Sequence, residues 1–306
     1  MEQSGGISII SPPSITDNNA ANNKVKSNGS SNGGGGGLAA STASRLMNAK
    51  EKLRVPWCKN DDGSAVEWLK KGVAEMIGTA IIVFLGCLGC VGSLGTAPTH
   101  LQICLSFGFA VMIAIVCTAH ISGAHLNPAV TVGTIVCGYT SLASAAVYII
   151  SQMAGGVLGY ALLKIITPQN HLHGGDPNTA AGFCATLLHP RVSILQGFFS
   201  EVIATGILVF MVCSISDSRN SRNTDSVAIK VGLAVAVLCF GFVPYTDCSM
   251  NPARSFGPAL INNLWTDHWL FWFGPMVGAL LSSLLYKTLF MPNLKEQRTI
   301  TPENGV

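Results

Sequence analysis

The triplet Asn-Pro-Ala occurs twice in this chain, each time inside an apolar stretch. Asparagine is a favoured N-cap, and proline suits the first helical position because no N–H is needed there. Each triplet therefore predicts a helix that begins within apolar surroundings. The residues are Asn127, Pro128 and Ala129 in the first copy and Asn251, Pro252 and Ala253 in the second.

The chain is also an internal duplication. Residues 74–87 align with residues 200–213 and share Glu, Ile, Thr, Ile, Val, Phe and Cys at matching places. Glu75 precedes the first triplet by nearly the same distance as Glu201 precedes the second. Two homologous repeats, at about 67–167 and 193–291, are therefore predicted to form one channel-like domain over 67–291.

The composition indicates that this domain lies in lipid. Charged residues make up 11% of the chain, and none occurs between Met76 and Leu163. Apolar spans of about 20 residues are long enough to cross the hydrocarbon core of a bilayer. Six such spans are predicted, at about 72–94, 100–120, 141–166, 193–216, 228–246 and 268–290.

Two further apolar segments, 127–138 and 251–262, are too short to cross. They are predicted to be re-entrant half-helices that reach only the middle of the membrane. Three full spans in each repeat invert the second repeat relative to the first, so the two triplets should meet near the midplane. The predicted fold is an all-α membrane protein with six transmembrane helices, two half-helices and an inverted repeat.

The basic residues predict the orientation. Nine of the 18 Lys and Arg residues precede residue 72, three lie in the 216–230 connector and three lie at the carboxyl end. The positive-inside rule then places both termini in the cytoplasm. Residues 1–66, rich in Asn, Ser and Gly, and residues 292–306 are predicted to be cytoplasmic tails, the first one disordered.

The 216–230 connector is polar and long enough to fold over the inner mouth of a pore. Phosphorylation of its hydroxyl groups would add negative charge beside arginines and change where it docks. An idle linker is the alternative, and the N-terminal tail is the other segment that could gate the channel. The candidate gate residues are Ser218, Arg219, Ser221 and Arg222.

The chain has ten cysteines, and nearly all fall within apolar spans or a re-entrant segment. We interpret them as small residues facing lipid or core, not as a disulfide framework. The His and Cys spacings do not predict a metal site, and no cofactor is expected.

The segments HISGAHLNPAVT at 120–131 and MNPARSFG at 250–257 resemble the two signature loops of the aquaporin (major intrinsic protein) family. The resemblance covers about residues 68–290, in the family's order and spacing. It implies a passive water channel that is not an enzyme, and a homotetramer with one pore per subunit.

The chemistry of water passage can be argued from the residues. Two helix N-termini that face one point oppose a cation there, while the amides of Asn127 and Asn251 can donate to a passing water. Glu75 and Glu201 are expected to hold the loops by accepting from buried donors, with a proton relay as the alternative. Irregular backbone before each triplet should line the pore with carbonyl groups, from Gly123, Ala124, His125, Asp247, Cys248 and Ser249.

The resemblance also implies a selectivity filter near the outer mouth, formed by Phe107, Cys239, Cys248 and Arg254. An arginine within the membrane is costly and therefore functional. Two positions depart from the family's pattern. Cys239 replaces the histidine usual in strict water channels, which predicts a wider and less polar opening. Asp247 replaces a glycine and either neutralises part of the charge of Arg254 or points into the vestibule, which we favour.

Three alternatives remain at this point. A wider channel for glycerol, hydrogen peroxide or ammonia is the nearest. A coupled secondary transporter also uses inverted repeats and broken helices, but the predicted pore lacks an obvious acidic site for a coupling ion. A membrane-junction role is the third. The expected partners are water, small neutral solutes and the bilayer of the plasma membrane or of vesicles, and not nucleic acid.

Overall fold

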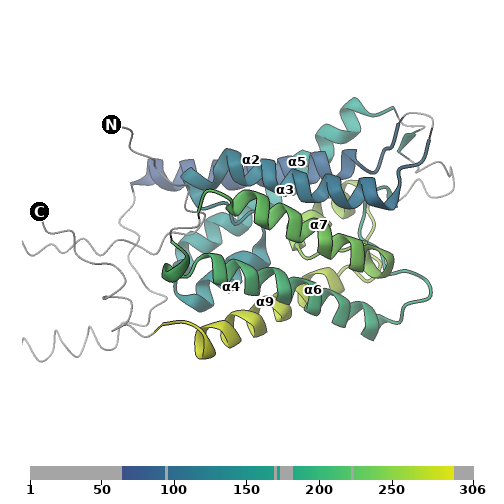
Figure 1. Cartoon of the computed structure of the whole chain (residues 1–306). Coiled ribbons are helices and arrows are strands. Elements are labelled where there is room, and N and C mark those ends of the chain that lie inside the picture. Colours follow the sequence, from purple (N-terminus) through teal and green to yellow (C-terminus); the bar gives the residue numbers. More distant parts are fainter. Residues whose placement is uncertain (1–63, 94–95, 169–170, 173–181, 222–223, 293–306) are drawn as a thin grey trace, which may run out of the picture.

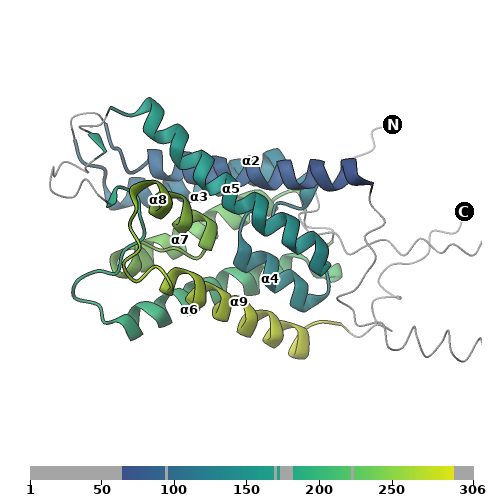
Figure 2. The same ribbon diagram turned by 180° about the vertical axis from the view of Figure 1, so that it is seen from behind.

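The computed structural model describes residues 64–93, 96–168, 171–172, 182–221 and 224–292. This part of the chain folds as a bundle of helices (Figures 1 and 2). The elements are α2 (Ala65–Leu88), α3 (His100–Ser122), α4 (Pro128–Cys137), α5 (Leu142–Ile166), α6 (Ile194–Ile215), η3 (Ser218–Asn220), α7 (Val227–Thr246), α8 (Pro252–Asn262) and α9 (Leu270–Leu289).

Six helices in the described part are long and apolar enough to cross a membrane, which confirms the six predicted spans. The largest difference lies in the first span, predicted at 72–94. Helix α2 begins earlier, because the side chain of Ser64 accepts a hydrogen bond from Glu67 N and caps the first turn. Exposed Lys70 then lies within a helix that is longer than the apolar segment it contains.

The predicted half-helices are present as α4 and α8, with 10 and 11 residues. Asn127 and Asn251 cap them, and a proline occupies the first turn of each. Helix α4 lies toward the end of the bundle where α2 begins and α9 ends, whereas α8 lies toward the opposite end (Figure 2). The two half-helices therefore approach the middle from opposite ends, as an inverted repeat requires.

The half-helices pack across the repeats. Helix α4 contacts α9 of the second repeat, and α8 contacts α5 of the first. The second contact is very close, because a Cβ at Gly156 would meet the carbonyl oxygen of Ala253. A Cβ at Gly257 would likewise meet the carbonyl oxygen of Gly156. These glycines let the backbones of α5 and α8 touch.

The distribution of side chains is typical of a membrane protein. Large apolar side chains are exposed on the outer helix faces; those of Ile150, Ile165 and Val237 are 72%, 77% and 66% exposed. The carboxylates of Glu75 and Glu201 are fully buried. Such an arrangement places apolar surface against lipid and polar groups where protein partners satisfy them.

The interpretation of the cysteines was wrong in one respect. Cys87, at the end of α2, forms a disulfide with Cys184 in the connector between α5 and α6. The two residues are 97 positions apart, and the spacing of cysteines in a sequence does not reveal such a pairing. Seven other cysteines in the described part are free, and Cys58 lies outside the described residues.

Candidate pore

A cavity in the middle of the bundle is lined by both signature loops and by long helices from both repeats. It brings together most of the predicted pore residues. Among the described residues that line it, Arg254 is the one with a fixed charge. The predicted pore residues in its wall are Phe107, Ala124, His125, Asn127, Cys239, Cys248, Ser249, Asn251 and Arg254. Gly123 and Asp247, which were predicted to contribute carbonyls, do not belong to this lining.

The two loops before the triplets adopt the same unusual backbone. The matched pairs are Gly123 and Asp247, Ala124 and Cys248, and Leu126 and Met250, all with positive φ. Positive φ is disfavoured for residues with a Cβ, so these loops need support from their surroundings. His125 and Ser249 occupy the matched positions between them.

The asparagines do more than was predicted. Their side-chain oxygens cap their own helices, on Ala129 N at 2.8 Å and on Ala253 N at 3.0 Å. One amide N–H of Asn127 donates to the carbonyl of Met250 at 2.8 Å. In the same way, Asn251 donates to the carbonyl of Leu126 at 2.9 Å.

These crossed bonds use part of the donor capacity that each asparagine amide could offer to a passing water. Each Nδ2 carries two hydrogens, of which one is used by the opposite repeat. The second hydrogen remains for a molecule in the cavity. The crossed bonds also join the two repeats at the middle of the bundle, which the spacing of the triplets alone could not indicate.

Glu75 holds the first loop from behind. Its carboxylate accepts from the hydroxyl of Ser122 at 2.6 Å and from the backbone N–H groups of His125 and Leu126 at 3.0 and 2.7 Å. A fourth donor is the side-chain amide of Gln152 at 2.8 Å. Four hydrogen bonds thus join this carboxylate to the loop and to its neighbours, and the carboxylate does not line the cavity.

Gln152 was missed by sequence reasoning. Its amide lies on α5, is fully buried and also donates to the hydroxyl of Thr131 at 3.0 Å. A glutamine among apolar residues within a predicted span is the signal that could have indicated it, because buried polar groups in lipid need partners.

Glu201 plays the matching part in the second repeat. It accepts from the hydroxyl of Thr246 at 2.7 Å and from the N–H groups of Ser249 and Met250 at 2.9 and 2.8 Å. A hydrogen bond of 2.6 Å between the hydroxyls of Ser249 and Ser255 then ties the loop to α8. Both repeats thus use a buried glutamate to support a loop with strained backbone.

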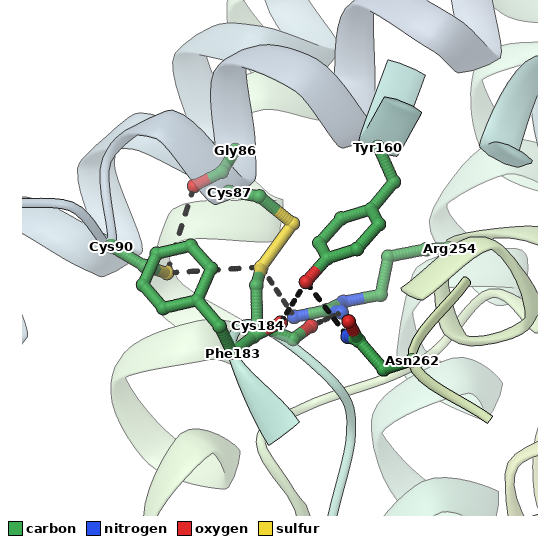
Figure 3. The surroundings of a disulfide bond; sticks show 8 residues. All are labelled: Gly86, Cys87, Cys90, Tyr160, Phe183, Cys184, Arg254 and Asn262. Atoms are coloured by element: carbon green, nitrogen blue, oxygen red, sulfur yellow. Dashed lines mark hydrogen bonds between the residues drawn. A yellow bond between two sulfur atoms is a disulfide. The ribbon is translucent and has the colours of Figure 1, made fainter. Parts of the chain in front are cut away.

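The four predicted filter residues come from three helices and one loop, and all are buried. The guanidinium of Arg254 lies 4.7 Å from the centre of the Phe107 ring, a cation–π distance. Its Nη1 donates to the carbonyl of Cys184 at 2.6 Å (Figure 3). The thiols of Cys239 and Cys248 complete the set in the cavity wall.

Asp247 does not form an ion pair with Arg254. The ion pair within the described residues joins Asp217 to Arg219. Its carboxylate instead accepts from the backbone N–H of Leu187 at 3.0 Å. Asp247 therefore ties the connector between α5 and α6 to the second loop.

The candidate gate lies in the connector after α6. Arg219 donates from its backbone and side chain to Asp217, and its Nη2 also reaches the carbonyl of Phe290 at 2.5 Å. Burial opposes the charged form of Asp217, but the hydrogen bonds from Arg219 and Tyr286 outweigh it and hold the pKa of Asp217 below its ordinary value. Ser218 and Arg219 lie in η3 and Ser221 follows it, whereas Arg222 lies outside the described residues.

Comparison with known proteins settles the family. The family model described as "Major intrinsic protein" matches residues 63–286. The chain belongs to this family. Aquaporin-4 of Mus musculus is 36% identical over 231 residues, which cover 74% of this chain and 69% of the relative. Aquaporin-2 of Rattus norvegicus is 37% identical over 223 residues, covering 73% and 79%.

The fold has a solved counterpart in the aquaglyceroporin from Plasmodium falciparum. That structure matches with a TM-score of 0.64 at 24% identity and covers 72% of this chain and 96% of its own. At this identity the likeness concerns the fold alone. The protein is therefore an aquaporin-family channel, a multi-pass membrane protein of a class that transports and does not catalyse.

Proposed function

We propose that this channel conducts water passively through a single-file pore and excludes protons and ions. The observation that carries the proposal is a single cavity whose lining includes both capping asparagines and Arg254. Water that enters this cavity meets amide donors at its middle and a fixed cation at the filter.

The half-helices supply the barrier to cations. Each helix N-terminus carries roughly half a positive elementary charge, and α4 and α8 direct these ends toward the same region. A water that accepts hydrogen bonds from both asparagine amides has its oxygen lone pairs occupied. Such a water cannot also accept a proton from its neighbour, so a proton wire is broken there.

Osmotic measurements on vesicles test this function. Purified full-length protein in liposomes should accelerate water efflux well beyond empty liposomes, while sodium permeability stays at the level of the empty control. Water permeability equal to that of empty liposomes would refute the proposal. Sodium-coupled uptake of a solute would instead favour a transporter.

A second function, conduction of slightly larger neutral solutes, is favoured by the filter. Cys239 places a thiol where strict water channels carry an imidazole, and the thiol is smaller and a weaker hydrogen-bonding group. We expect hydrogen peroxide to pass before glycerol. Cys239→His should lower the peroxide-to-water permeability ratio while water flux is kept, and an unchanged ratio would show that residue 239 does not set the width.

Regulation, orientation and assembly belong to the same proposal. The connector after α6 is proposed as a gate on the cytoplasmic side, with both termini in the cytoplasm and four subunits in the assembly. The contacts of Arg219 with Asp217 and with the end of α9 support a defined docking place for this connector. Equal water permeability per protein with and without residues 218–224 would eliminate the gate.

A further inference from the structure

Six cysteines gather around the filter end of the cavity. They belong to one apolar cluster with Phe107, or pack against it, although they come from separate parts of the chain. One pair is joined as a disulfide and four are free thiols. The six are Cys87, Cys90, Cys104, Cys184, Cys239 and Cys248.

One member of the joined pair, Cys184, contacts the filter arginine directly. Nη1 of Arg254 donates to the carbonyl of Cys184 at 2.6 Å, and Nη2 approaches the sulfur of the same residue at 3.8 Å (Figure 3). Nε of Arg254 has no hydrogen-bond partner among the residues that the structure describes. The guanidinium is thus oriented by the carbonyl of Cys184 and by the ring of Phe107.

Cys184 is held in a conformation that it would not adopt freely. Its φ is 56°, in the left-handed region that side chains with a Cβ disfavour. Neighbouring residues are tied elsewhere, because the hydroxyl of Tyr160 donates to the carbonyl of Phe183 at 2.7 Å and Asp247 accepts from Leu187. The disulfide is the covalent tie on Cys184 itself.

We propose that the Cys87–Cys184 disulfide is a positioning element of the selectivity filter: it holds the Cys184 carbonyl in place as the acceptor for Arg254. With the disulfide broken, Cys184 can relax away from its left-handed conformation and withdraw that acceptor. The guanidinium then loses a charge-assisted hydrogen bond and swings, and the filter discriminates less against larger neutral solutes. This inference rests on the proposed channel function.

The chemistry of the break is a reduction. A dithiol reductant such as dithiothreitol gives two electrons and two protons to the disulfide, and it becomes a cyclic disulfide while Cys87 and Cys184 become thiols. Cys90 offers an internal route, because its sulfur lies 3.9 Å from that of Cys184. Exchange through Cys90 would form a Cys90–Cys184 bond and release Cys87 as a thiol, so a Cys90 variant is needed as a control.

The test compares solute selectivity with the disulfide present and absent. Full-length protein in liposomes is assayed for water efflux and glycerol uptake before and after dithiothreitol, with thiols counted by mass spectrometry. We expect reduction to raise the glycerol-to-water ratio by roughly tenfold, a change that loss of one hydrogen bond to a charged group can produce. Cys87→Ser combined with Cys90→Ser, in which no Cys90–Cys184 bond can replace the native one, should show the raised ratio without reductant and should not respond to it.

Cys90→Ser is the matched control and should behave like the wild type in both states. An unchanged ratio in reduced protein whose thiol count confirms the break would overturn the proposal. An equal loss of water flux and glycerol flux per folded protein would also overturn it, because that indicates a role in stability alone. A thiol count that shows Cys87 and Cys184 free before reduction would overturn it as well. If the double variant does not fold, the reduced wild type decides the result. Failure of the channel function would differ, since the oxidised wild type would then conduct no water.

Discussion

Glutamine has nearly the size and shape of glutamate. Even so, Glu75→Gln should destabilise the channel measurably. The carboxylate accepts four hydrogen bonds, two on each oxygen. In Glu75→Gln an NH₂ group replaces one of these oxygens and faces two donors. If the NH₂ group replaces Oε1, the Ser122 hydroxyl can rotate away and accept from it. If it replaces Oε2, the Gln152 amide can flip and accept with its oxygen, which has no partner in the described part of the chain.

The other donor at each position is a backbone N–H, of His125 or of Leu126, and it cannot adapt. One buried N–H is therefore left unpaired, which costs about 2 kcal/mol. For a folded unit of this size that corresponds to a fall in Tm of roughly 4–8 °C. The loss should appear as a lower melting temperature of the purified protein in detergent.

Glu201 and Glu67 provide matched variants. Glu201→Gln should cost about the same as Glu75→Gln, because the hydroxyl of Thr246 can rotate and one backbone N–H is again left unpaired. Glu67→Gln changes an exposed residue of α2 and should stay within about 0.5 kcal/mol of the wild type. A melting temperature for Glu75→Gln equal to that of Glu67→Gln would refute the view that the carboxylate anchors the loop.

Three further predictions concern the filter, the connector and the packing of α8. Mercuric ions should block water flux through Cys248, and inhibition that persists in a Cys248→Ser, Cys239→Ser double variant would show that neither thiol lies in the filter. Because the pKa of Asp217 is lowered, its contribution to stability is present above about pH 4 and is lost as the pH falls below that value, so Asp217→Asn should flatten the pH dependence of Tm there. Gly156→Ala should cost about 1–3 kcal/mol because its Cβ meets the Ala253 carbonyl, whereas Gly241→Ala, with open space, should be neutral or stabilising in the same melting assay.

The architecture was predictable because its determinants are local or periodic. Helix caps at Asn127 and Asn251, spans of the right length and a duplicated pattern are all written along the chain, and each constrains the fold independently. The buried glutamates could be assigned as loop anchors for the same reason, since a carboxylate in lipid needs donors and the loops supply them.

The contacts at the filter could not be predicted, because they join segments whose approach depends on the folded connector. The Cys87–Cys184 bond, the Arg254–Cys184 hydrogen bond and the Asp247–Leu187 hydrogen bond all involve residues after α5. Sequence spacing does not fix where such a connector returns to the bundle. The crossed asparagine bonds could not be predicted either, because their acceptors are backbone carbonyls, which any residue could offer.

Those crossed bonds have a consequence for the order in which the protein is completed. The amide of Asn127 needs the carbonyl of Met250, which the ribosome adds more than a hundred residues later. Until the second repeat is inserted, the centre of the first repeat holds a polar group with its native partner missing. A first half expressed alone should therefore lack the acceptor for the Asn127 amide at its core. Two halves divided between residues 168 and 182 and made in the same membrane would supply each other with these acceptors.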